Sequence, residues 1–201
     1  VLAKWAMTLQ NGDVLDRSQL MQQFTEHLHD RELLTQAEFE RLHSLGEESL
    51  GRYIDERLVE PYPVVFKVEH EVRAHLEPSK ALDTSIPLKG KVDRIDVAAP
   101  DSARATVIDF KTGKPKTPAQ IEKYGYHRQL TFYSLLIELS SLPIEPETFV
   151  LDFVGEGSES PVERRYEISE QERTELAATI EAVWGNCLLY TSDAADEKRW
   201  G

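Results

Sequence analysis

The chain has 201 residues, of which 40% are hydrophobic, and this is enough for one domain with a sizeable hydrophobic core. Its formal net charge of −13 argues against a protein that coats DNA without specificity, because contacts to phosphate favour basic surfaces. A single cysteine excludes an internal disulfide, and also a cysteine-ligated iron–sulfur cluster built from this chain alone. The single cysteine favours a reducing, cytoplasmic setting. The sequence shows no apolar run long enough to span a membrane and no signal-peptide pattern.

The first sixty residues predict helices. Residues 1–10 already read as the middle of a helix and the chain does not start with methionine, so we expect a fragment of a longer protein. Asp16 is placed to cap a second helix, whose apolar residues recur at helical spacing. Thr35 and Glu38 form a capping box for a third helix, which we expect to stop at Pro61.

The rest of the chain alternates between strands and helices. Runs rich in Val and Ile, bounded by Gly, Pro, Asp and Ser, predict strands over residues 64–76, 87–96, 105–114, 148–154 and 162–168. Thr117 and Pro118 are suitable first residues for a helix that continues to about Ser140. Ser169 and Glu172 form a second capping box, at the start of a final helix.

Charged residues gather on the two central strands. Asp109 and Lys111 are two positions apart, so they share one face of their strand, while Phe110 points to the other. If this strand pairs with the preceding one, Asp93 lies beside Asp109. Two carboxylates with a lysine next to them form a site for a divalent ion, with a cation that can steady a phosphate or an attacking water. The alternative is a pair of solvent-facing aspartates, although Asp is depleted in strands.

Three patterns follow one another in the sequence: Gly90-x-x-Asp93-Arg94, Ile108-Asp109-Phe110-Lys111-Thr112-Gly113, and Gln129-Leu130-x-x-Tyr133. In this order and at this spacing they resemble the RecB-like branch of the PD-(D/E)XK nuclease superfamily, over about residues 64–140. The chain looks most like the nuclease domain at the C-terminus of UvrD/Rep-type DNA helicases and of the AddAB/RecBCD helicase–nucleases. The Asp-x-Lys pair alone is a weak signal, whereas the three patterns together are a strong one.

The resemblance implies a restriction-endonuclease-like α/β core, with a small mixed β-sheet flanked by helices on both sides. It implies hydrolysis of DNA phosphodiesters in recombination or double-strand-break repair, with Mg²⁺ or Mn²⁺ as cofactor. The metal ligands would be the carboxylates of Asp93 and Asp109 and the main-chain carbonyl of Phe110. Lys111 would stabilise charge on the scissile phosphate. The alternative role of Lys111 is an ion pair with Asp109 that takes no part in the chemistry.

Further candidate site residues lie on the neighbouring elements. Gln129 and Tyr133 are one helical turn apart, and in the resemblance they face the active site, where they would contact Lys111 or DNA. The alternative is a surface Gln and a core Tyr. Glu69 and Glu71, on the preceding strand, are candidates for the shell around the metal ligands, and a place on the strand surface is at least as natural for them.

A local basic cluster follows the second central strand. Its members are candidate phosphate contacts, although any one of them alone would be an ordinary surface charge. The cluster consists of Lys114, Lys116, Lys123 and Arg128. Arg94 alternates away from Asp93, where it could pair with a carboxylate on a helix, and we expect it to be structural, while Asp96 remains ambiguous.

The chain departs from the resemblance in one respect. Many RecB-like domains supply a metal-binding His from an N-terminal helix, and no such motif is visible here. His27 and His29 lie in a polar stretch and are expected on the surface. We therefore expect the helix with that ligand upstream of residue 1, and its loss would put the activity of this fragment, though not of its parent, in doubt.

These features divide the chain into an N-terminal helical segment (1–60), a nuclease core (61–186) and a tail (187–201). The tail resembles the translation of an adapter used in DNA sequencing libraries, so we expect it to be non-native. The chain has no Walker A pattern, so a helicase motor would lie upstream or in a partner. Two alternative functions stay open: an inactive nuclease-like domain that only binds DNA, and a module that binds a helicase through its acidic helices.

Overall fold

A mixed five-stranded sheet forms the centre of the computed structural model, which describes residues 2–13, 16–31, 34–57, 62–78, 84–155 and 162–196. The strands lie in the order of the chain: β1 (Val64–Leu76), β2 (Ile86–Val97), β3 (Arg104–Lys111), β4 (Glu145–Phe153) and β5 (Val162–Tyr166). β3 and β4 run parallel, and every other neighbouring pair runs antiparallel. A parallel pair needs a crossover connection, and helices provide it here.

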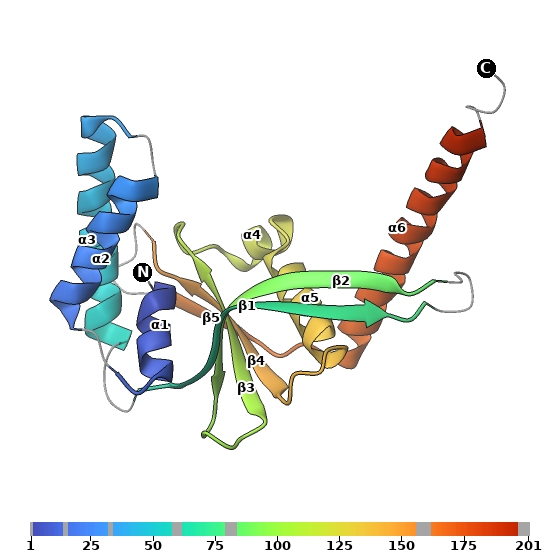
Figure 1. Ribbon diagram of the computed structural model, residues 1–201, viewed down its shortest axis with the longest axis horizontal. Coiled ribbons are helices and arrows are strands. Elements are labelled where there is room, and N and C mark those ends of the chain that lie inside the picture. Colours follow the sequence, from blue (N-terminus) through green and yellow to red (C-terminus); the bar gives the residue numbers. More distant parts are fainter. Residues whose placement is uncertain are drawn as a thin grey trace.

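Helices gather on both sides of this sheet, as Figure 1 shows. The elements α1 (Leu2–Gln10), α2 (Arg17–Arg31) and α3 (Gln36–Arg57) lie on one side. The crossover between β3 and β4 contains α4 (Pro118–Lys123) and α5 (Tyr126–Glu138), and α6 (Glu170–Asp196) packs against α5 on the other side. The expected α/β fold, a small mixed sheet with helices on both sides, is confirmed. No described helix combines the length and the apolarity needed to cross a membrane.

Two hydrophobic clusters hold these layers together. The larger one fills the space between the sheet and α5, and its fully buried members include Val92, Ile95, Leu130, Leu136 and Leu151. The smaller one joins the N-terminal helices to the opposite side of the sheet, and it includes Trp5, Leu20, Leu50, Tyr53 and Val65. The sheet therefore has a separate apolar contact with each helical group.

The glycine of the first sequence pattern allows α5 to approach β2 closely. A Cβ atom at Gly90 would lie 2.8 Å from a methyl carbon of Leu136 and 3.2 Å from the ring of Phe132. Both neighbours belong to α5, which also carries Gln129 and Tyr133. The missing side chain thus sets the distance between the strand of Asp93 and the helix that faces it.

The local signals for helix ends are largely confirmed. The N–H of Thr35 donates to Glu38 at 3.0 Å, and the N–H of Ser169 donates to Glu172 at 2.7 Å, as in a capping box. The expectation of one helix up to about Ser140 is wrong, because the chain breaks between α4 and α5 at Gly125, whose φ is +70°.

Element bounds elsewhere differ from the predicted ones by a few residues. β3 ends three residues earlier than expected, β4 begins three residues earlier and β5 ends two residues earlier. The expected helix stop at Pro61 falls outside the described residues.

Candidate active site

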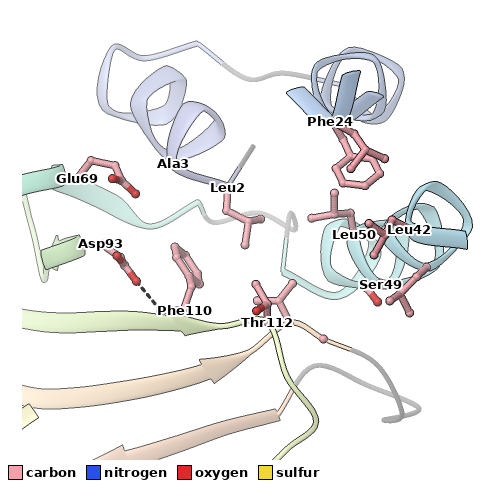
Figure 2. A pocket seen from close by; sticks show the side chains of 15 residues that line it. Leu2, Ala3, Phe24, Leu42, Ser49, Leu50, Glu69, Asp93, Phe110 and Thr112 are labelled. Atoms are coloured by element: carbon pink, nitrogen blue, oxygen red, sulfur yellow. Dashed lines mark hydrogen bonds between the residues drawn. The ribbon is translucent and has the colours of Figure 1, made fainter. Parts of the chain in front are cut away.

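The predicted site lies at a fork, where β2 and β3 separate. The last pair of their antiparallel ladder joins Arg94 to Ile108, so Asp93 and Asp109 are the next positions on the two strands. Beyond this point β2 continues to pair with β1, and β3 continues to pair with β4. In place of main-chain pairing with β2, the main-chain N–H of Phe110 donates to Oδ2 of Asp93 at 2.8 Å (Figure 2). The fork therefore sets two carboxylates next to each other without a ladder between them.

A hydrogen-bonded network connects the fork to α5. Nζ of Lys111 lies 2.5 Å from Oδ2 of Asp109 and donates to Oε1 of Gln129 at 2.9 Å. Nε2 of Gln129 donates to Oδ1 of Asp109 at 2.9 Å and to Oη of Tyr133 at 2.8 Å. The hydroxyl of Tyr133 donates to the main-chain oxygen of Lys91 on β2, also at 2.9 Å. The structure thus brings together Asp109, Lys111, Gln129 and Tyr133, which the sequence placed on two elements.

Two tyrosines border the lysine and the carboxylate of this network. Nζ of Lys111 lies 4.4 Å from the ring centroid of Tyr126, within reach of a cation–π contact. Burial, together with the charge of Asp109, raises the pKa of Tyr133 to about 12. The hydroxyl of Tyr133 consequently stays protonated at neutral pH and can donate a hydrogen bond. Sequence reasoning did not select Tyr126, whose position at the first turn of α5 becomes significant only once Lys111 lies beneath it.

Burial governs the electrostatics of the two carboxylates. Desolvation raises the pKa of Asp93, and the nearby charges of Asp109 and Glu69 add to this, whereas the N–H of Phe110 opposes it. Desolvation also raises the pKa of Asp109, against the opposing effect of Lys111. Two carboxylates that are partly removed from water and close together repel each other, and a bound cation would remove that cost.

The oxygen atoms at the fork suit a hard divalent ion. Asp109 is only 2% exposed, and its Oδ2 has the ammonium of Lys111 as its neighbour at 2.5 Å. In a strand, the N–H and the C=O of one residue point to the same edge, so the carbonyl of Phe110 faces the side of Asp93. Two carboxylates and one carbonyl are an adequate protein contribution for Mg²⁺ or Mn²⁺, since such ions keep several waters.

The described part of the chain contains no group of three His, Cys, Asp or Glu side chains that could hold a metal ion. A site at the fork therefore depends on the main-chain carbonyl as its third protein ligand. His29 is exposed and stacks on Phe39 at a centroid distance of 4.2 Å, and His27 is half-buried on the same helix. The expected surface position thus fits His29 better than His27.

Glu69 borders the fork from β1. The register of β1 and β2 sets it opposite Asp93, and its φ of +49° is unusual for a residue other than glycine. Its carboxylate forms an ion pair with Lys91. Glu69 and Asp93 also border the same cavity (Figure 2). Of the two glutamates considered on this strand, the structure brings Glu69 to the site.

Glu71 lies apart from the fork. It is exposed, and it forms ion pairs with Arg73 and Lys89, which lower its pKa. This is the surface position that the sequence left open for either glutamate.

The basic cluster surrounds the loop that follows β3 and the start of the crossover helices. Nζ of Lys116 lies 5.7 Å from the ring centroid of Tyr124, and Lys114, Lys123 and Arg128 are exposed. Three of the four side chains are thus exposed and Lys116 is half-buried, and their role as phosphate contacts remains a prediction.

Arg94 has a different partner from the one expected. The predicted ion pair with a helix carboxylate is wrong, because Nε and Nη2 of Arg94 donate to Asp96 at 2.7 and 2.5 Å. Residues two apart on a strand share a face, and this makes the bidentate pair possible within one strand. Arg94 is 5% exposed, and its guanidinium lies 5.1 Å from the ring of Trp5 on α1. The pair is therefore buried beneath the N-terminal helices.

Two residues close to the fork, on α3 and β4, were not selected from the sequence. The hydroxyl of Tyr53, on α3, donates to Oδ2 of Asp152 at 3.0 Å, and its ring contacts Phe110 edge-on at 6.3 Å. Asp152 pairs with Phe110 across β3 and β4, so Tyr53 spans both strands at the level of the site. The available signal was an Asp inside an otherwise apolar strand, where Asp is depleted.

The sheet, the crossover helices and the paired carboxylates with their lysine define an α/β domain of the nuclease type. A sequence model of the PD-(D/E)XK nuclease superfamily matches residues 2–199, and the chain belongs to this superfamily. Nucleases of this superfamily generally use divalent metal ions.

Solved structures with some likeness to the chain are remote. The protein SSO0001 has 16% sequence identity and a TM-score of 0.43, over 75% of this chain and 60% of its own. A protein from Eubacterium rectale, provisionally assigned as an exonuclease, has 12% identity and a TM-score of 0.43, over 93% of this chain and 65% of its own. The chain thus spans less than two thirds of either protein. A search of curated proteins finds no match.

Proposed function

We propose that this chain is a metal-dependent deoxyribonuclease domain that hydrolyses phosphodiester bonds with Mg²⁺ or Mn²⁺. The observation that carries the proposal is the fork between β2 and β3, where Asp93 and Asp109 meet beside Lys111. The carboxylates of Asp93 and Asp109 and the carbonyl of Phe110 would hold the ion. When bound, the ion would supply a Lewis acid that lowers the pKa of the attacking water.

The residues around the ion have separate tasks in this proposal. Lys111 presents its ammonium group to the phosphate, where it offsets the negative charge that develops as water attacks. Gln129 fixes Lys111 through its Oε1 and Asp109 through its Nε2, so both groups keep their orientation before DNA arrives. Tyr133 holds Gln129 in turn and connects it to β2.

The wider setting is also a proposal. The sequence patterns resemble nuclease domains of the RecB-like branch, which supports a role in recombination or double-strand-break repair beside an ATP-dependent helicase. In this scheme residues 1–60 form the helical segment that packs on a nuclease core of residues 61–186. The cytoplasm would be the place of action, since the DNA of such repair systems lies there.

The experiment that tests the activity is cleavage of labelled single- and double-stranded DNA by the purified chain, in Mn²⁺ and in EDTA. Asp109→Ala should abolish cutting, and Asp101→Ala, in the exposed turn between β2 and β3, should leave it intact. Metal-dependent cutting that only the first variant loses would support the proposal. An inactive chain that still binds DNA, without binding Mn²⁺, would contradict it and favour the DNA-binding module.

A further inference from the structure

A cavity of about 490 Å³ opens beside the proposed metal ligands, between the N-terminal helices and the sheet. We name it the apolar pocket, and its walls include Leu2, Phe24, Leu42, Leu45, Leu50 and Val154. Asp93, Glu69 and Phe110 border it as well, so the pocket and the fork share residues. Figure 2 shows Glu69 and Asp93 at one end, and Phe24, Leu42 and Leu50 at the other.

The chemistry of the walls limits what the pocket can hold. No Lys, Arg or His is among the described residues that border it, so it offers nothing to balance a phosphate. Its two carboxylates lie only at the end that meets the fork (Figure 2). Apart from Ser49 and Thr112, the remaining surface is aliphatic with two phenylalanine rings, and it suits a flat, uncharged group. Its volume falls within the range of about 300–1,000 Å³ that is usual for small-molecule pockets.

A nucleotide has both parts that this arrangement requires. Its phosphate is the group on which the fork would act, and its base is flat and largely apolar on its faces. A base can reach the pocket only if it leaves the stack of a duplex, because a paired base is held inside the helix. The position of the pocket, directly beside Asp93, therefore selects a strand whose bases are unpaired.

We propose that the apolar pocket binds an unstacked nucleobase next to the scissile phosphate, so that the substrate is single-stranded DNA or a frayed end. This inference rests on the proposed function, and it adds the substrate class. The rings of Phe24 and Phe110 supply aromatic contacts, and the leucines of α3 supply the opposite wall. Because these contacts do not read the hydrogen-bonding edges of a base, the pocket accepts any of the four bases.

The test uses single-stranded DNA in which one base beside the mapped cleavage position is replaced by an abasic tetrahydrofuran unit. The abasic strand should be cut at least about 10-fold more slowly, as expected for the loss of one base contact of this kind. Leu42→Trp, which fills the pocket, should slow cleavage of the intact strand by a similar factor and leave the abasic strand unchanged. Met7→Trp, at an exposed position of α1, is the matched control and should behave like the natural chain.

Binding gives a second readout that does not depend on cleavage. In EDTA, fluorescence anisotropy should show the intact strand binding about 10-fold more tightly than a strand made only of abasic units, and Leu42→Trp should remove this difference. Equal cutting of intact and abasic strands, with equal binding, would overturn the proposed nucleobase site and leave the nuclease proposal unaffected. A chain that never cuts DNA but still prefers the intact strand would overturn the nuclease proposal and support the pocket.

Discussion

The main-chain N–H of Phe110 donates to Oδ2 of Asp93 at 2.8 Å, and this contact replaces the strand pairing that ends one residue earlier. Through it, a single residue of β3 fixes a carboxylate of β2. The ring of Phe110 meets Tyr53 of α3, and its strand partner on β4 is Asp152. The N-terminal helices therefore support the proposed metal site through the contact between Tyr53 and Phe110.

Asp93→Asn should stabilise the fold in the absence of metal at neutral pH. Burial raises the pKa of Asp93, so the folded chain binds its proton more tightly than the unfolded chain. Below the unfolded pKa of about 3.9, Asp93 is protonated in both states and costs no stability. The cost is complete once the pH exceeds the raised pKa of Asp93 in the folded state. The amide oxygen of Asn can still accept from Phe110 without carrying a charge.

Thermal unfolding in EDTA checks this prediction. The melting temperature of Asp93→Asn should exceed that of the natural chain at pH 7, and the gain should shrink as the pH approaches about 4. Added Mn²⁺ should raise the melting temperature of the natural chain and not that of the variant. A lower melting temperature for Asp93→Asn at pH 7 would show that the charged form of Asp93 is favoured by the fold.

Lys111→Met should show whether Lys111 takes part in cleavage or only forms an ion pair with Asp109. Removal of a preorganised charge at the phosphate is expected to lower the rate of cleavage by about 10²–10³-fold. Mn²⁺ should bind the variant at least as tightly, because a positive charge 2.5 Å from Oδ2 of Asp109 has been removed. The measurement combines single-turnover cleavage with Mn²⁺ titration, and Lys89→Met, on the exposed face of β2, serves as control. An unchanged rate with reduced stability would assign Lys111 to an ion pair alone.

Tyr53→Phe and Tyr53→Leu should have different effects on the site. The Phe variant keeps the ring against Phe110 and loses the hydroxyl that donates to Asp152. It should lower the free energy of unfolding by about 1–3 kcal/mol and leave Mn²⁺ affinity unchanged. The Leu variant also loses the edge-on contact behind the proposed ligand, so its Mn²⁺ affinity should fall about 10-fold. Equal Mn²⁺ affinities in the two variants would contradict a positioning role for the ring.

Asp96→Ala should be among the most damaging single changes in the sheet. It leaves the guanidinium of Arg94 buried without its bidentate partner, which is expected to cost about 3–5 kcal/mol of unfolding free energy. Glu147→Ala breaks a bidentate pair with Arg104 of similar geometry at an exposed position, and should cost far less because water replaces the partner. Urea unfolding of both variants measures the difference, and equal losses would contradict the importance of burial.

Local patterns predicted most of the elements and the residues of the candidate site. The capping boxes at Thr35 and Ser169 were readable because their partners lie three residues away. Asp109 and Lys111 share a face because the period of a strand is two. The order of the three sequence patterns indicated the superfamily to which the chain belongs.

Only the tertiary structure decided which distant groups meet. Tyr53 and Asp152 are 99 residues apart, and their contact depends on how α3 crosses the back of the sheet. The partner of Arg94 proved to be Asp96, two residues along the same strand, and the guanidinium lies against Trp5 of α1. The apolar pocket likewise exists only where α1, α2 and α3 meet the fork. Sequence periodicity fixes the faces of separate elements, whereas packing between elements fixes which faces come together.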